Sequence, residues 1–258
     1  MAKAFTILLF LCALSCISRN EKQSQHAVYD ETALKDFVMT SMGPEKEKAP
    51  AMMDSVIRDA ENDSAIYKKT ISFLTRGFGD PNSSFRNAEL YSQLLHSEIR
   101  SKWYSEAEKN VAQKRLRLLM QNNPGQPAND FSFVSPEGKT RRLYDIKANN
   151  ILLLFYNPEC EACKEMKQRI ENSPIINSKQ HSGQLKVLAI YTDKDETIWR
   201  RHLGEMPKAW IHGRDENEYL YTNGVYDLRA IPTIYLLDKH KKVVLKDCVS
   251  VDEIEKKL

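Results

Sequence analysis

The sequence predicts an α/β domain, with a central mixed sheet flanked by helices, preceded by a small all-α domain. Ile151–Tyr156 (ILLLFY) indicates the α/β domain, because it is a short, continuous apolar run of the kind that forms a buried strand between parallel neighbours. A charged, helix-compatible run follows it from Cys160. The all-α domain is indicated by a long stretch in which apolar residues recur every three or four positions. We therefore expect domains over residues 16–122 and 123–258.

Each helix of the first domain is predicted by its own apolar stripe, with Gly and Pro between the stripes. The breaks fall at Gly43–Pro44, Gly77–Pro81 and Pro124–Gly125, and Ser105 with Glu108 forms a capping box for the last helix. No phosphate loop, metal cluster or nucleophile motif occurs here, so we expect these residues to form a core; a partner-docking or dimerising face is the alternative. The stripes are Met52, Met53, Val56 and Ile57; Ile66, Ile71, Leu74 and Phe78; Leu90, Leu94, Leu95 and Ile99; and Ala112, Leu116 and Leu119.

The motif Cys160-Glu161-Ala162-Cys163 carries the chemistry predicted for the second domain. A helix that begins there places its first free backbone N–H groups beside Cys160, and this positive dipole end stabilises a thiolate, the form of cysteine that attacks disulfides. A zinc site needs two further ligands, and His181, His202 and His212 are scattered along the chain. Simply packed cysteines are the third interpretation. The motif favours redox chemistry without a metal or organic cofactor.

A second motif, Ile231-Pro232-Thr233, precedes a strand predicted over Ile234–Leu237. A cis peptide bond before proline costs little, so it can turn the chain sharply and expose the backbone of the preceding residue. An ordinary trans proline at the first residue of a strand is the alternative.

Together these motifs resemble the thioredoxin-like proteins, and more narrowly the branch that includes the TlpA and ResA proteins. Ala128–Phe133 stands where that branch has its first strand, Pro136–Thr140 supplies a hairpin turn, and Leu143–Ile146 leads into the central strand. The resemblance implies a thiol-disulfide oxidoreductase.

The resemblance also implies roles for individual residues. Cys160 would be the attacking thiol, and Cys163 would complete the redox disulfide. Pro232 would follow a cis bond and lie against both cysteines, with Ile231 offering its backbone to an extended substrate.

The remaining elements of this domain follow from local patterns. Lys186–Thr192 predicts a strand, Glu196–Leu203 a helix and Lys241–Lys246 the last edge strand, while Ser250 is placed to cap a C-terminal helix.

The chain departs from the family in its acidic residues. Many thioredoxins have a buried Asp six positions before the first cysteine, where this chain has Leu154. The branch often has a Glu three positions after the second cysteine, where this chain has Met166. Glu165 and Asp193 are therefore candidates for proton transfer, although both are also typical of solvated surface residues.

Charge near the motif favours one direction of reaction. Glu159, Glu161 and Glu165 surround the thiols, partly offset by Lys164 and Lys167, and like charge disfavours a thiolate. A less stabilised thiolate makes a less oxidising couple, so we expect a reductant of disulfides. A disulfide-donating oxidant is the alternative, and a non-catalytic binding module is a third possibility that the missing acidic residues favour slightly.

The first residues predict export. An apolar stretch over Ala4–Leu14 ends at Ala13-Leu14-Ser15-Cys16, which resembles a bacterial lipoprotein signal. Residues 1–15 would be removed and Cys16 would carry lipid, holding the protein on a membrane surface of the cell envelope, facing the periplasm. A plain secretory signal is the alternative.

Among the other cysteines, Cys248 is expected to be a small buried apolar residue, or else an auxiliary thiol.

Composition agrees with this interpretation. The 258 residues are 41% hydrophobic with a formal charge of +3, and no basic stripe with interleaved aromatics suggests nucleic-acid binding. The helical domain, by its position ahead of a thioredoxin-like domain, resembles the domain of unknown function DUF5106 of Bacteroidota envelope lipoproteins. The expected partners are disulfide-containing envelope proteins and an upstream membrane thiol donor.

Overall fold

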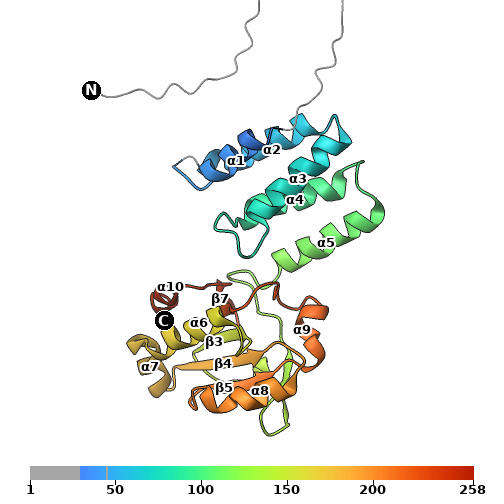
Figure 1. Ribbon diagram of the computed structural model, residues 1–258. Helices are drawn as coiled ribbons and strands as arrows, with labels where there is room; N and C mark the ends of the chain where they lie inside the picture. Colours follow the sequence, from blue (N-terminus) through green and yellow to red (C-terminus); the bar gives the residue numbers. More distant parts are fainter. Residues whose placement is uncertain (1–29, 45) are drawn as a thin grey trace, which may run out of the picture.

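The computed structural model describes residues 30–44 and 46–258, in a helical part and an α/β part joined by a narrow waist (Figure 1). Cys12 and Cys16 lie outside the described residues. No helix within residues 30–44 and 46–258 is long and apolar enough to cross a membrane. The helical part consists of α1 (Glu31–Thr40), the short 3-10 helix η1 (Lys46–Lys48), α2 (Ala49–Ala60), α3 (Ser64–Phe78), α4 (Ala88–Arg100) and α5 (Glu106–Met120).

Capping residues fix where these helices begin. Asp63 accepts hydrogen bonds from the first free N–H groups of α3, and Asn87 does so for α4. Ser105 and Glu108 form the predicted capping box of α5. The apolar stripes of α2, α3 and α4 meet in one core that α5 joins through Ala112, which confirms the predicted patterns with one exception. Met52 is 43% exposed, because it lies about 100° around the helix from the buried Met53.

The α/β part is built on a seven-stranded mixed sheet with strand order β2-β1-β5-β4-β3-β6-β7. The central strand β3 pairs in parallel with β4 but antiparallel with β6, so the expectation of parallel neighbours is wrong on one side. The strands are β1 (Ser132–Val134), β2 (Thr140–Arg142), β3 (Asn150–Tyr156), β4 (Leu185–Tyr191), β5 (Ile211–Arg214), β6 (Thr233–Asp238) and β7 (Val243–Lys246).

Alternate residues of β3 enter two separate cores. Leu152, Leu154 and Tyr156 face the core that contains Cys163, whereas Leu153 and its alternate neighbours face a second core on the other side of the sheet. Both faces are covered, which explains why the strand is apolar at nearly every position.

The segments between the strands cover the sheet. Ser250 accepts a hydrogen bond from the N–H of Glu253 and caps the last helix, as predicted. The segments are η2 (Leu143–Asp145), α6 (Glu161–Glu171), α7 (Pro174–His181), α8 (Glu196–His202), η3 (Leu203–Glu205), η4 (Glu216–Glu218), α9 (Tyr219–Thr222) and α10 (Val251–Glu255).

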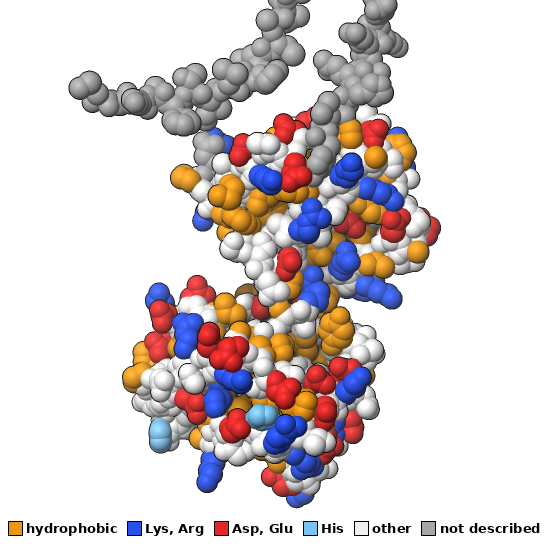
Figure 2. Space-filling view, viewed as in Figure 1, with side chains coloured by type: hydrophobic (Ala, Val, Ile, Leu, Met, Phe, Trp, Pro, Cys, Tyr) orange, Lys and Arg blue, Asp and Glu red, His pale blue; other side chains and the backbone are white. Residues whose placement is uncertain are grey.

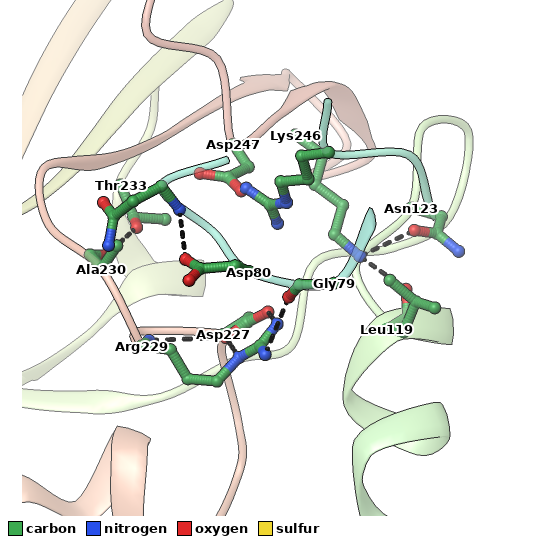
Figure 3. A network of polar contacts seen from close by, with 12 residues as sticks. Gly79, Asp80, Leu119, Asn123, Asp227, Arg229, Ala230, Thr233, Lys246 and Asp247 are labelled. Carbon is green, nitrogen blue, oxygen red and sulfur yellow. Dashed lines mark hydrogen bonds and ion pairs between the residues drawn. The ribbon is translucent and has the colours of Figure 1, made fainter. Parts of the chain in front are cut away.

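Two cations of the α/β part join it to the helical part (Figure 3). The ammonium of Lys246 donates hydrogen bonds of 2.8 Å to the carbonyl oxygens of Leu119 and Gln121 and to the side chain of Asn123, at the end of α5. Arg229 donates to the carbonyl oxygen of Gly79, which follows α3, at 3.2 Å. The waist is therefore a polar interface that binds the loop before β6 to the helical part.

Candidate active site

Cys160 occupies the N-cap position of α6. Its sulfur accepts a hydrogen bond from the backbone N–H of Cys163 at 3.3 Å. An N-cap residue normally uses a side-chain oxygen for this purpose, so the helix begins in the way the sequence predicts but with sulfur as the acceptor. The free N–H and the helix dipole both stabilise negative charge on this sulfur.

The loop before β6 lies on the other side of Cys160. The thiol lies 3.7 Å from the carbonyl oxygen of Ile231, to which it is placed to donate a hydrogen bond. The Ile231–Pro232 peptide bond is cis, as predicted. Thr233 fixes the end of this loop by donating its hydroxyl hydrogen to the carbonyl oxygen of Ala230 at 2.6 Å. Two segments that are far apart in the sequence thus meet at one sulfur.

Cys163 lies in the first turn of α6 and is only 2% exposed. Burial raises the pKa of its thiol, and the neighbouring Cys160 thiol adds to this effect. Both cysteines are free thiols in the structure. The partly exposed sulfur of Cys160 suits the attack on a substrate, and the buried sulfur of Cys163 suits the later intramolecular step.

A small cavity of about 30 Å³ opens beside Cys163. It has room for one water molecule. Leu154 forms part of its apolar wall, so no acidic side chain enters the cavity from this position of β3. Polar side chains also line the cavity: Asn157, Lys164, Lys167, His202 and Glu205.

His202 and Glu205 form a hydrogen-bonded pair. The Nδ1 atom of His202 lies 3.0 Å from a carboxylate oxygen of Glu205, and this bond lowers the pKa of Glu205. Lys167 donates to the backbone carbonyl of Glu205 at 2.7 Å and ties this segment to α6. Sequence reasoning missed the pair, since the i, i+3 spacing of a His and a Glu was the only available signal.

The two proton-transfer candidates from the sequence do not line this cavity. Glu165 lies on the exposed face of α6, while the adjacent Met166 is buried. Asp193 follows β4, and its carboxylate accepts a hydrogen bond from the N–H of Asp195 at 3.2 Å. The structure therefore brings neither side chain into the cavity beside Cys163.

The glutamates flanking Cys160 are exposed. Glu161 pairs with Lys164 across 3.3 Å on the surface of α6, and no ion pair is formed by Glu159 among the described residues. Solvent screens such charges, so they disfavour a thiolate less strongly than buried carboxylates would.

Cys248 is 7% exposed and packs in the same core as Cys163. Burial raises the pKa of its thiol. This position agrees with the expectation of a small buried apolar residue. Within residues 30–44 and 46–258, no cluster of three or more His, Cys, Asp or Glu side chains could hold a metal ion.

Comparison with known proteins agrees with this arrangement. Two family models match the chain: a domain of unknown function (DUF5106) over residues 19–122 and a thioredoxin-like model over residues 149–243. The thiol-disulfide oxidoreductase ResA of Bacillus cereus is 28% identical over 123 residues, which are 47% of this chain and 68% of that protein.

Solved structures from Bacteroides share the fold. A thioredoxin-like protein from Bacteroides caccae is 31% identical with a TM-score of 0.71, over 89% of this chain and 88% of that chain. The C-terminal domain of an uncharacterized protein from Bacteroides fragilis is 39% identical with a TM-score of 0.52, over 53% of this chain and 97% of that domain. The chain therefore belongs to the thioredoxin-like thiol-disulfide oxidoreductases, with a DUF5106 domain preceding its thioredoxin-like domain.

Proposed function

We propose that this protein reduces disulfides in proteins of the cell envelope through Cys160 and Cys163. The observation that carries the dithiol chemistry is the position of the Cys160 sulfur, which lies between the backbone N–H of Cys163 and the carbonyl oxygen of Ile231. The direction of the reaction is proposed from Glu159 and Glu161, the exposed acidic residues on either side of Cys160. A substrate that approaches this sulfur meets the free backbone of the loop before Pro232.

The reaction transfers two electrons to the substrate. The Cys160 thiolate attacks one sulfur of the substrate disulfide, so that a mixed disulfide forms and the other substrate sulfur leaves as a thiolate that takes up a proton. The Cys163 thiol then loses its proton and attacks the Cys160 sulfur. This step forms the Cys160–Cys163 disulfide and releases the second substrate sulfur as a thiol.

The second step requires a proton acceptor for Cys163, because burial strongly favours its neutral form. We propose that the His202–Glu205 pair takes this role through the cavity beside Cys163. Glu165 is exposed on α6 and Asp193 accepts from Asp195, so both remain weaker candidates.

The reduction potential tests the direction of the reaction. The exposed glutamates predict a couple near the thioredoxin end of the scale, about −200 to −270 mV, whereas the oxidant DsbA lies at about −120 mV. Equilibration of the protein with glutathione or dithiothreitol buffers measures this value. A potential above about −150 mV would reassign the protein as a disulfide-donating oxidant.

One observation favours the oxidant as the second candidate. The hydrogen bond from the Cys163 N–H to the Cys160 sulfur stabilises a thiolate, and a stabilised thiolate makes the reduced form more stable and the couple more oxidising. The same titration decides between the two functions, because both depend on the same dithiol.

The proposed location is a membrane surface of the cell envelope, facing the periplasm, where a membrane thiol donor would return the dithiol to its reduced form. This proposal is based on Ala13-Leu14-Ser15-Cys16, which lies outside the described residues. Intact-mass analysis of the mature protein should show a chain that begins at Cys16 and carries acyl groups. A mature chain that begins elsewhere without acyl mass would reject lipid anchoring and leave the redox proposal intact.

A further inference from the structure

A basic groove lies at the waist of the molecule, between α5 of the helical domain and the α9 segment of the thioredoxin-like domain. It has a volume of about 690 Å³, within the range of ligand-binding clefts. Figure 2 shows blue side chains gathered beside the waist, next to the hollow that separates the two parts. The lining of the groove includes Lys114, Arg117 and Gln121 from α5 and its C-terminal end, and Tyr221, Asn223 and Arg229 from the thioredoxin-like domain.

One face of α5 forms the upper wall of this groove. Arg117 and Leu118 lie three and four residues after Lys114, and Gln121 lies four and three residues after them, so all four residues share one side of the helix. A cation in the last turn of a helix is favoured by the helix dipole, which accounts for Arg117. The dipole does not account for Lys114 and Arg115, which lie a turn earlier.

The positive charge of the groove is only partly balanced. Arg229 pairs with Asp227 at 2.8 Å, and Arg115 acts on the buried carboxyl of Glu98. No acidic side chain lines the groove, and Lys114 and Arg117 are exposed and form no ion pair with any described residue. Two cations are therefore available to an anionic ligand.

The opposite wall can accommodate a peptide. Tyr221 is 58% exposed and offers an aromatic ring, and Thr222 and Asn223 offer polar groups. The side chain of Gln121 bonds to the carbonyl oxygens of Gly224 and Val225, which holds α5 against this wall. An aromatic ring, polar side chains and cations together suit an extended acidic polypeptide.

The groove leads to the redox site. Arg229 lines the groove and is held by Asp227 and by the carbonyl oxygen of Gly79 (Figure 3). Ile231 is two residues further along the chain, so the Cα atoms of Arg229 and Ile231 are at most about 7 Å apart. The carbonyl oxygen of Ile231 faces the Cys160 sulfur. A polypeptide attached to Cys160 as a mixed disulfide can therefore continue into the groove.

We propose that this groove binds an acidic segment of the substrate polypeptide, adjacent to the cystine that Cys160 attacks. The identity of the ligand as a redox substrate rests on the proposed function, whereas the binding of an acidic polypeptide in the groove does not depend on it. The helical domain thereby supplies part of the substrate-binding surface.

The test uses disulfide peptides with identical cystine loops and three different flanks: Asp and Glu, the matching Asn and Gln, or Lys. The reduced full-length protein should reduce the acidic peptide about tenfold faster than the amide peptide, measured as a second-order rate constant at low salt. The double variant Lys114→Glu/Arg117→Glu should abolish this preference, and added salt should weaken it in the wild type. The single variant Lys239→Glu, at an exposed lysine of the β6–β7 turn, is the surface control and should keep this preference.

A second arm separates the groove from the chemistry. Labelled versions of the acidic and amide peptides, with serine in place of cysteine, are titrated with each protein and followed by fluorescence anisotropy. The groove is supported if the wild type and Lys239→Glu bind the acidic peptide and the double variant does not. This result would support the groove even if the wild type reduces no peptide. Absence of acidic binding, or equal binding of both peptides by wild type and double variant, would overturn the inference.

Discussion

Asp215 should weaken the folded state at neutral pH, and its replacement by Asn should relieve this effect. The side chain is 1% exposed and follows β5. One carboxylate oxygen accepts a hydrogen bond from the N–H of Leu220 at 2.9 Å, but the other is buried without a partner. Burial raises the pKa of Asp215 from 3.8 to about 6.

The size and sign of the effect follow from this shift. A carboxyl whose folded-state pKa lies above its unfolded value binds its proton more tightly in the folded chain, so protonation stabilises the fold. This contribution is fully present below pH 3.8 and is lost as the pH rises through about 6. Raising the pKa from 3.8 to about 6 corresponds to at most about 3 kcal/mol of stability. Local relaxation around the carboxylate lowers this contribution, so we expect roughly 1–3 kcal/mol.

Urea unfolding of the wild type and Asp215→Asn between pH 4 and pH 8 measures this contribution. Because Asn is isosteric with the protonated carboxyl and cannot ionise, the two proteins should have similar stability at pH 4. The variant should be more stable by roughly 1–3 kcal/mol at pH 8. Glu216→Gln, an exposed neighbour, should show no such divergence. A variant that is no more stable than the wild type at pH 8 would refute the reasoning.

Two further predictions concern the proton path and the waist. His202→Gln should slow the attack of Cys163 on a preformed mixed disulfide by about a hundredfold or more, without changing the first attack by Cys160. Rapid-mixing kinetics measures both steps, and an equal effect of the surface variant His181→Gln would contradict the assignment. Lys246→Met removes three hydrogen bonds that a cation donates to residues 119, 121 and 123, each worth roughly 1.5–3 kcal/mol. Amide hydrogen exchange should therefore become faster at residues 119–123, but not in β3. Unchanged exchange at residues 119–123 would show that Lys246 does not hold the two parts together.

Periodicity predicted most helices and strands, but not the elements whose form depends on distant contacts. Strand β5 (IHGR) is short and has little apolar character, but it pairs with β4 and β1, and the missing side chain of Gly213 leaves room for the Phe133 ring. A Cβ atom at Gly213 would lie 2.3 Å from the Phe133 ring. The first predicted strand, Ala128–Phe133, is in fact shorter and shifted, since only Ser132–Val134 pairs in the sheet and the N–H of Ala128 bonds to Lys241 instead.

The candidate site likewise has parts that short motifs predict and parts that depend on contacts between distant segments. Cys160, Cys163 and the cis bond before Pro232 were predictable because short motifs specify them. The cavity that brings His202 and Glu205 to Cys163 was not, because it exists only once α8 and η3 pack beside α6. The basic groove likewise depends on how the two domains contact each other.

The most direct test of the central claim is the capture of substrates by single-cysteine variants in cells. Cys163→Ser should accumulate mixed disulfides with envelope proteins on a non-reducing gel, because Cys160 still attacks and nothing resolves the product. Cys160→Ser should capture few, since its remaining thiol is buried. Both variants should carry Cys248→Ser to remove the third thiol of the described chain. Equal capture by the two variants would contradict the assignment of Cys160 as the attacking thiol and Cys163 as the resolving thiol.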